Sequence, residues 1–142
     1  MIYLRFNDDC QPRYMSKYSS SCDLISRVDI VIEPQQRVAV PTGVWIDKID
    51  WTAVPLNTIP EIQIRARSGL SLKHGICLAN GIGTIDVDYP DEICVILINL
   101  STTPFNIKKG DRIAQMCINL CYKFPQISSE GQRKGGLGST GY

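Results

Sequence analysis

The chain has 142 residues and a formal net charge of +1, with 15 Lys and Arg against 14 Asp and Glu. This length fits one domain with a buried core, and so small a charge provides no broad field for nucleic acid or an acidic membrane surface. We therefore expect neither of these partners. No apolar run reaches the roughly 18 residues of a membrane-spanning helix. Residues 1–9 lack the basic start and long apolar run of a secretory signal, so none is expected.

Short β-branched segments, separated by Gly, Pro and Asn, dominate the chain. We predict strands at residues 28–32, 37–40, 44–46, 62–66 and 93–100, then a strand, turn and strand over 106–116. Residues 62–66 alternate with the period of a half-buried strand. Residues 93–100 are almost continuously apolar, which also fits a buried helix, but their β-branched content favours a central strand. Many short strands of this kind predict a closed or sandwiched all-β domain.

One short helix is expected around residues 68–73, with Ser68 as its N-cap and Gly75 at its end. Residues 124–142 lack apolar periodicity. We therefore divide the chain into a β core domain, residues 1–125, and a Gly-rich C-terminal arm, residues 126–142.

The last ten residues hold four glycines, a serine, a threonine and two cations. A terminus of this composition is usually a frayed tail. Glycine N–H groups, hydroxyls and cations can also form a cradle for phosphate. The tail alone leaves both interpretations open.

Six cysteines and a single histidine, His74, invite a disulfide or zinc interpretation. There is no C-x-x-C pair, and His74 with Cys77 and two distant cysteines is not a recognised ligand spacing. Cys94 lies in an apolar run, where a small buried side chain is the expected role. The composition favours reduced thiols in a cytosol-like compartment.

Three polar clusters interrupt the apolar scaffold. Arg67-Ser68-Gly69 follows a predicted strand and opens the helix, which suits an anion site or simply a capped helix with a surface arginine. In residues 80–89, Asp86 and Asp88 are spaced i, i+2 and are predicted on one face of a strand, as catalytic or merely solvated acids. Residues 110–115 predict a turn and a strand start, with Gln115 as a donor to phosphate.

Five segments in order carry a family resemblance. They are Asp23-Leu24, Ala66-Arg67-Ser68-Gly69-Leu70, Gly83-Thr84-Ile85-Asp86-Val87-Asp88-Tyr89, Gly110-Asp111-Arg112-Ile113-Ala114-Gln115-Met116 and Gly135-Gly136-Leu137-Gly138-Ser139-Thr140-Gly141. Together they resemble the five ordered motifs of the trimeric dUTPases, which are dUTP nucleotidohydrolases. The resemblance covers residues 4–142 and is densest over 67–118.

The resemblance implies a jelly-roll-like β-clip barrel with one short helix and a flexible C-terminal arm that closes over the active site. It implies a homotrimer with shared active sites and Mg²⁺ as cofactor. The implied reaction is Mg-assisted attack of water on the α-phosphate of dUTP, giving dUMP and diphosphate. Such an enzyme limits uracil incorporation into DNA and supplies dUMP for dTMP synthesis. It would be cytoplasmic, or in the host cytosol or nucleus if viral.

Residue by residue, the resemblance implies Asp86 as the catalytic acid that positions water, and Asp23 as the acid that reaches the metal through water. Base and sugar would be bound by Asn80, Gly81, Ile82, Gly83, Thr84, Ile85, Tyr89 and Leu137. In this set, residues 80–84 match a hairpin whose backbone pairs with uracil, and Tyr89 leaves no room for a ribose 2′-hydroxyl. Phosphates would be bound by Arg67, Ser68, Gly69, Gln115, Arg133, Gly138, Ser139 and Thr140.

The chain departs from the family pattern in the first and last motifs. The family's first motif reads Ala-Gly-aromatic-Asp-Leu, whereas this chain has Ser20-Ser21-Cys22-Asp23-Leu24 and so lacks the glycine before the acid. In the last motif, Leu137 replaces a phenylalanine that stacks on the base. Gln132 stands where the family has an arginine, so Arg133 or Lys134 would meet the γ-phosphate. The link over residues 44–66 is also longer than usual.

Two other functions are alternatives to dUTP hydrolysis. A dCTP deaminase shares the fold, but its catalytic glutamate would fall near Ile96, in an apolar stretch. A dUTPase-like nucleotide-binding or signalling protein with weak turnover would suit the altered motifs. A direct assay of diphosphate release separates it from the enzyme.

Overall fold

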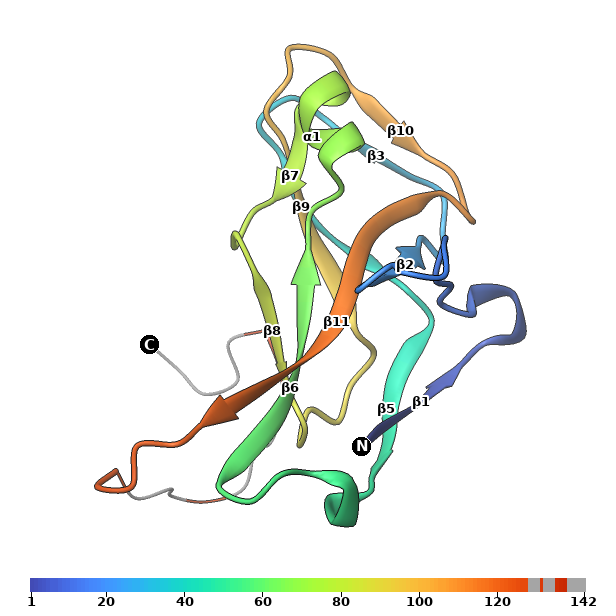
Figure 1. The fold of residues 1–142 in the computed structure, drawn as a ribbon. Coiled ribbons are helices and arrows are strands. Elements are labelled where there is room, and N and C mark those ends of the chain that lie inside the picture. Colours follow the sequence, from blue (N-terminus) through green and yellow to red (C-terminus); the bar gives the residue numbers. More distant parts are fainter. Residues whose placement is uncertain (128–130, 132–134, 138–142) are drawn as a thin grey trace.

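The computed structural model describes residues 1–127, 131 and 135–137. Within that part the chain forms eleven β-strands, one α-helix and two short 3-10 helices (Figure 1). In chain order these elements are β1 (Ile2–Phe6), η1 (Asp8–Cys10), β2 (Cys22–Ile25), β3 (Ile30–Ile32), β4 (Arg37–Pro41), β5 (Val44–Ile49), η2 (Trp51–Ala53), β6 (Thr58–Arg65), α1 (Ser68–His74), β7 (Ile76–Leu78), β8 (Gly83–Asp86), β9 (Cys94–Asn99), β10 (Phe105–Ile107) and β11 (Arg112–Tyr122).

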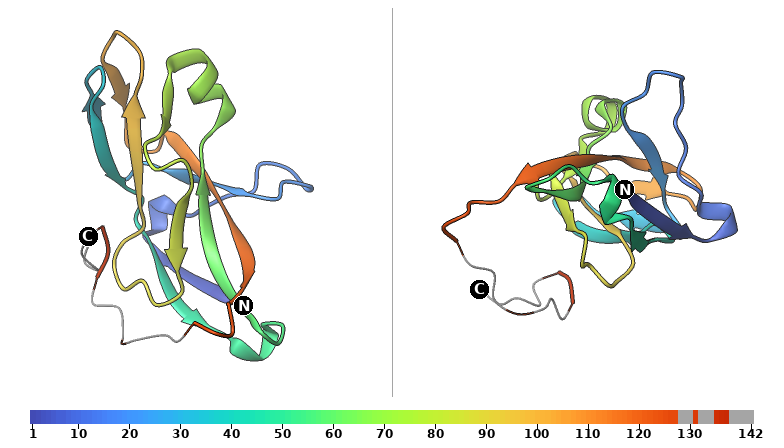
Figure 2. Two further views of the ribbon diagram at one scale, coloured as in Figure 1. Left: turned by 90° about the vertical axis from the view of Figure 1, so that its left-hand side faces the viewer. Right: turned by 60° about the horizontal axis from the view of Figure 1, so that its bottom comes forward.

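The strands pair antiparallel in four small sheets. The largest has the order β2-β11-β6-β8, so β8 is an edge strand. A second sheet has the order β4-β9-β7, and two-stranded ribbons pair β1 with β5 and β3 with β10. In the left view of Figure 2, β6 and β11 lie on one side of the molecule and β4 and β9 on the other. The edge strand β8 of the first sheet and the central strand β9 of the second line one cavity.

The apolar core fills the space between the sheets, as the alternating sequence of β6 requires. Ile62 and Ile64 are buried at 2% and 1% exposure, while the alternating residues Glu61 and Gln63 remain partly exposed. Removing such apolar side chains from water is the main driving force of folding. The start of β11 adds buried side chains from the same sheet as β6, and β9 supplies buried side chains from the second sheet. The largest fully buried side chains are Leu24, Ile32, Ile62, Ile64, Ile76, Ile93, Leu97, Ile107, Ile113, Val40, Val44 and Val95.

Most predicted elements are confirmed. Strands occur at β4, β5, β6 and β9, and the strand predicted from residue 28 begins at Ile30. The almost continuously apolar run of residues 93–100 is strand β9 and not a helix. Residues 108–111 form the predicted turn, although β10 pairs with β3 while β11 pairs with β2 and β6.

Two local expectations are wrong. Ser68 does not cap α1: the N-cap is Arg67, whose backbone is still extended (φ −88°, ψ 122°) and whose carbonyl accepts from the Ser71 N–H at 3.0 Å. The chain leaves β6 extended through Arg67, so Ser68 is already helical. Asp86 and Asp88 do not share a strand face, because β8 ends at Asp86. Gly75, by contrast, ends the helix as predicted.

Among the described residues, no helix has both the length and the apolar character needed to cross a membrane.

Candidate active site

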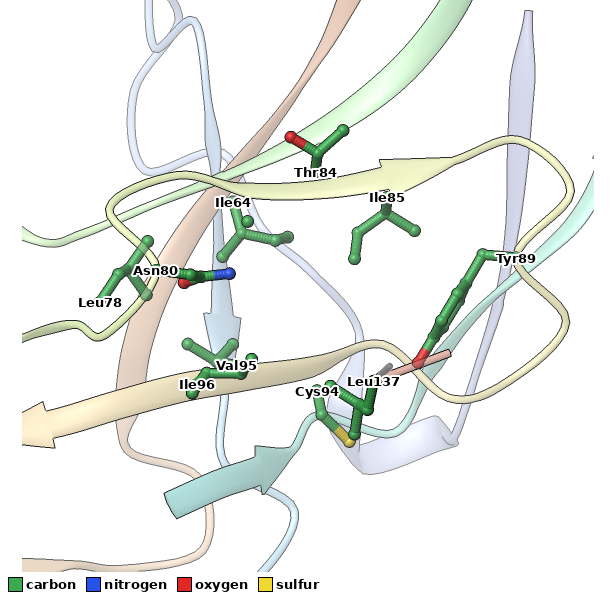
Figure 3. A pocket seen from close by; sticks show the side chains of 11 residues that line it. Ile64, Leu78, Asn80, Thr84, Ile85, Tyr89, Cys94, Val95, Ile96 and Leu137 are labelled. Atoms are coloured by element: carbon green, nitrogen blue, oxygen red, sulfur yellow. The ribbon is translucent and has the colours of Figure 1, made fainter. Parts of the chain in front are cut away.

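A small cavity of about 80 Å³ lies between β8 and β9, at the open edge of the four-stranded sheet (Figure 3). It brings together six of the residues predicted to bind base and sugar. Side chains of β9 and the buried residues Ile64 and Leu78 complete it. The lining residues are Ile64, Leu78, Asn80, Gly83, Thr84, Ile85, Tyr89, Cys94, Val95, Ile96 and Leu137.

The segment predicted as a hairpin instead connects two sheets. β7 pairs with β9, whereas β8 pairs with β6, so residues 79–82 cross from one sheet to the other and the expected hairpin is wrong. Two backbone hydrogen bonds hold this crossing segment: the Gly81 N–H donates to Leu78 O (3.3 Å), and the Ile82 N–H donates to Asn80 O (2.8 Å). Because β8 is an edge strand, alternate backbone groups point away from β6, toward the open edge. Such groups can pair with the edge of a base.

Gly83 allows β8 to approach β6 closely. A Cβ at this position would lie 2.9 Å from Ile64 Cβ, closer than real Cβ contacts allow. Any larger residue would therefore push β8 outward and change the width of the cavity that Ile64 and Ile85 line.

Tyr89 closes one end of the cavity. Its side chain is 8% exposed, its N–H donates to Asp86 O at 3.0 Å, and its hydroxyl donates to Glu92 O at 3.3 Å. Figure 3 shows the ring reaching from the loop after β8 toward Leu137, which lies beside Cys94. An apolar ring at the mouth of a small cavity suits packing against a sugar.

Asp86 lies at the end of β8 but outside the cavity lining. Alternation along β8 places it on the face opposite Ile85, and it pairs in register with Glu61 of β6. The Glu61 carboxylate accepts hydrogen bonds from Gln63 Nε2 at 2.8 Å and from Asn119 Nδ2 at 3.1 Å. These two bonds lower the pKa of Glu61. The outer face of the sheet beside Asp86 is therefore acidic at neutral pH.

A second cluster of predicted residues forms around Asp23. Its carboxylate, 4% exposed, accepts from Arg112 Nη1 at 3.0 Å and from Gln115 Nε2 at 3.1 Å. Arg67 Nε lies 3.9 Å from Asp23 Oδ1, and Arg67 Nη1 donates to Arg112 O at 2.8 Å. Three predicted residues, Asp23, Arg67 and Gln115, thus meet on β2, β11 and the residue before α1. Two guanidinium groups and an amide at one carboxylate form a set of donors suited to phosphate oxygens.

Arg112 was not among the predicted site residues, although it lies in the same motif as Gln115. In a regular strand, residues three apart face opposite sides. The pairing of β11 with β2 shifts register between Arg112 and Ala114, and this irregularity lets both Arg112 and Gln115 reach Asp23. The apolar lining from β9 (Cys94, Val95 and Ile96) was also missed, since an apolar run does not reveal which side faces a cavity.

Of the other residues predicted to bind phosphate, the structure describes only two. Ser68 and Gly69 are exposed at the start of α1, next to Arg67. Arg133, Gly138, Ser139 and Thr140 lie outside the described residues, as does Lys134. Gly81 and Ile82 lie in the exposed crossing beside the cavity.

The cavity and the Asp23 cluster lie on opposite faces of the four-stranded sheet. Ile64 and Ile85 face inward, whereas Gln115, Arg65 and Asp23 share a rung on the outer face. Along β6, Arg65 lies four positions from Glu61, the partner of Asp86, and four steps at strand spacing span roughly 13 Å. A single chain therefore does not collect all the predicted site residues in one place.

Among the side chains of the Asp23 cluster, the carboxylate of Asp23 is the one whose oxygen atoms are the ligand type that magnesium prefers. In the described part of the chain, no group of three or more His, Cys, Asp or Glu side chains is arranged to hold a metal. Asp23 offers one carboxylate beside a cavity of about 370 Å³ that Asp8 and Asp9 also line. Magnesium keeps several waters and favours substrate phosphates, so one water-bridged carboxylate fits it.

Comparisons with known proteins agree with this geometry. A family model described as dUTPase matches residues 10–141. Proteins named deoxyuridine 5'-triphosphate nucleotidohydrolase from Zymomonas mobilis and Finegoldia magna are 40% and 42% identical over 135 and 138 residues. These matches cover 92% of this chain in both cases and 87% and 91% of the relatives.

The fold is that of solved dUTPases. A variant dUTPase from phage phi11 of S. aureus, described as coordinating a structural Mg(II) ion, superposes with a TM-score of 0.72 at 18% identity, covering 95% of this chain and 99% of the other. This likeness confirms the predicted all-β, jelly-roll-like fold. The family match and the two relatives confirm the resemblance seen in the five motifs, and the chain belongs to the dUTPase family.

Proposed function

We propose that this protein is a dUTP diphosphatase, which hydrolyses dUTP to dUMP and diphosphate. The observation that carries the proposal is the pairing of two separate sites: an edge-strand cavity closed by Tyr89, and the Asp23 cluster with its two arginines and Gln115. The first suits a base and a deoxyribose, and the second suits phosphates. Family membership and the names of the relatives support the same reaction.

In the proposed reaction, Asp86 orients a water molecule and takes a proton from it as the water oxygen attacks the α-phosphorus. The bond from that phosphorus to the bridging oxygen breaks, and diphosphate leaves. Arg67, Gln115 and Arg112 would bind the phosphate oxygens and offset their charge. Phosphoryl displacement needs positioning and charge neutralisation more than covalent help, which these side chains provide.

Mg²⁺ is the proposed cofactor. Asp23 would hold it through water, while the triphosphate supplies its other oxygens, and the bound ion would offset charge on the phosphates.

We also propose that the enzyme is a homotrimer with shared sites, in which the cavity and Asp86 of one chain meet the Asp23 cluster of a neighbour. Two features of the single chain support this arrangement: the cavity lies on the opposite face of the sheet from the Asp23 cluster, and Asp86 lies roughly 13 Å along the sheet from it. Residues 126–142 would act as the arm that closes the site, and residues 1–125 as the core. Leu137 lines the cavity of its own chain in this structure. Whether the arm closes the site of its own chain or that of a neighbour is not specified by the proposal.

Cavity chemistry separates the proposal from a deaminase. The position at which a deaminase would carry its glutamate is Ile96, which lines the cavity and offers no group to transfer a proton. The exclusion of nucleic acid and membranes as partners, and a cytosolic location, remain predictions. The six cysteines, all unpaired in the structure, support a reducing compartment.

Direct measurement of diphosphate release from dUTP, UTP and dCTP in Mg²⁺ tests the proposal. We expect rapid release from dUTP and at least about 100-fold lower kcat/KM for the other two, because backbone groups left unpaired by a wrong base reject it strongly. Tight binding of dUTP with negligible release would support the nucleotide-binding alternative instead.

A further inference from the structure

The loop that carries Tyr89 is anchored by one acidic side chain. Glu92 receives Arg27 in a bidentate pair, Nε to Oε1 at 3.0 Å and Nη2 to Oε2 at 2.9 Å. The Gly43 N–H donates to the same Oε1 at 2.6 Å. The exposed fractions of the Arg27 and Glu92 side chains are 39% and 17%. Two-point pairing of a planar guanidinium with a carboxylate fixes direction as well as distance.

The anchor is tied to the framework on both sides. The Arg27 N–H donates to Pro41 O at 2.9 Å, and the Ile93 N–H donates to Val44 O at 2.8 Å. The Thr42 hydroxyl donates to Ile93 O at 2.6 Å. Residues 41–44, at the junction of β4 and β5, thus hold both Arg27 and the residue after Glu92.

Glu92 connects this anchor to the cavity through its own backbone. Its carbonyl oxygen accepts the Tyr89 hydroxyl at 3.3 Å, so the position of Glu92 bears on the position of the ring. The loop between β8 and β9 is held at its other end by a hydrogen bond from the Tyr89 N–H to Asp86 O. A ring fixed at both ends presents a constant wall to whatever enters the cavity.

We propose that Arg27 and Glu92 are positioning residues that set the sugar selectivity of the site by holding Tyr89 in place. The inference rests on the proposed function, in which Tyr89 packs against the deoxyribose and excludes a 2′-hydroxyl. A ring free to shift by a fraction of an ångström admits that hydroxyl. Arg27 is 62 positions before Tyr89 in the chain and touches no substrate in this scheme; it acts through Glu92.

The test uses Arg27→Ala and the conservative Arg27→Lys, with the ratio of kcat/KM for dUTP to that for UTP as the readout. We expect Arg27→Ala to lower this ratio by about tenfold, within the range by which pockets reject an added hydroxyl. The lower ratio should come from a higher kcat/KM for UTP as well as a higher KM for dUTP. Lysine should restore the ratio only in part, because it pairs as a point charge.

Tyr89→Phe tests whether Arg27 acts on the ring through Glu92. It removes the hydroxyl that bonds to Glu92 O, so it should lower the ratio by a similar factor, and adding Arg27→Ala should lower it no further. The control Lys108→Ala breaks an exposed ion pair with Asp29 (3.1 Å) elsewhere on the surface and should leave the ratio unchanged.

A purely structural role is excluded by comparing thermal stability with selectivity. If Arg27→Ala lowers the melting temperature but leaves the dUTP to UTP ratio at the parental value, the inference is overturned. Measuring Kd for non-hydrolysable dUTP and UTP analogues distinguishes a failure of this inference from a failure of the proposed function. A parent chain that prefers the dUTP analogue but does not turn over dUTP overturns the function, while the effect of Arg27→Ala on the Kd ratio still decides the inference. A parent chain without that preference overturns the inference.

Discussion

Gly136 lies directly against the ring of Tyr89. A Cβ at position 136 would overlap Cε2, Cζ and the hydroxyl oxygen of the ring, so only glycine fits there with the chain in this position. The next residue, Leu137, lines the cavity. One glycine of the C-terminal segment therefore has a steric role, because it lets the backbone pass close enough for Leu137 to reach the site.

We expect Gly136→Ala to weaken substrate binding. Either the segment or the ring must move, and over-packing of this kind costs about 1–3 kcal/mol. The KM for dUTP should therefore rise at least about fivefold, with a smaller effect on kcat. Leu56→Ala, at an exposed position outside both the cavity lining and the C-terminal arm, is the control and should behave like the parent. An unchanged KM for the alanine variant at 136 would show that this contact has no part in binding.

Asp86→Asn should reduce kcat for dUTP by about 10²–10⁴, as expected for loss of a general base, while dUTP still binds. Asp88→Asn is the control, because Asp88 is exposed beyond the end of β8 and should change kcat little. Steady-state release of diphosphate measures both. Equal losses in the two variants would contradict the assignment of Asp86.

Asp23→Asn should lower the free energy of unfolding, because the buried carboxylate accepts from Arg112 and Gln115 and lies near Arg67. Asparagine removes the negative charge and keeps only one acceptor oxygen, so one of the two donors faces an NH2 group, and leaving such a buried donor unpaired costs about 1–3 kcal/mol. Urea unfolding measures the change. Asp29→Asn, whose ion pair with Lys108 is exposed, should leave the unfolding curve almost unchanged. A stability loss of the same size in both variants would argue against a special role for the buried cluster.

Mixing Asp86→Asn chains with Arg67→Ala chains should restore activity that neither variant has alone. If sites are shared, the cavity and Asp86 of the Arg67→Ala chain can meet the intact Asp23 cluster of the other chain. The two variants are unfolded together, refolded as a mixture and assayed for diphosphate release, with each variant refolded alone as the control. No recovery in a mixture that forms mixed oligomers would mean that each chain completes its own site.

Burial raises the pKa of the Cys94 thiol, with the nearby Glu92 carboxylate acting in the same direction. A raised pKa leaves less thiolate at neutral pH, so alkylation of Cys94 should be slow there. It should speed up about tenfold per pH unit until the raised pKa is passed. A non-hydrolysable dUTP analogue should protect Cys94, which lines the cavity, but not Cys77, which lies on β7 outside it. Peptide mass spectrometry after N-ethylmaleimide treatment measures both thiols, and equal protection would contradict the assignment of the cavity.

Local pattern was enough to predict most of the strands and the end of the helix. The alternation of Ile62 and Ile64 with polar residues identified β6 because a strand with one buried face must repeat every two residues. Gly75 marked the end of α1 because it adopts a left-handed conformation, φ 66°, which other residues resist. The order of the five motifs was sufficient to indicate the family, since it depends only on the linear sequence.

Only the tertiary structure decided how these pieces meet. The hairpin expected at residues 80–84 is a crossing between sheets, because the choice of partner strand depends on long-range pairing that local sequence does not encode. The register shift in β11 brings Arg112 to Asp23, and the pairing of Arg27 with Glu92 joins residues 65 positions apart. Composition, periodicity and motif order can be read along the chain. Contacts between distant side chains depend on strand order, register and bulges, which form only when the whole core packs.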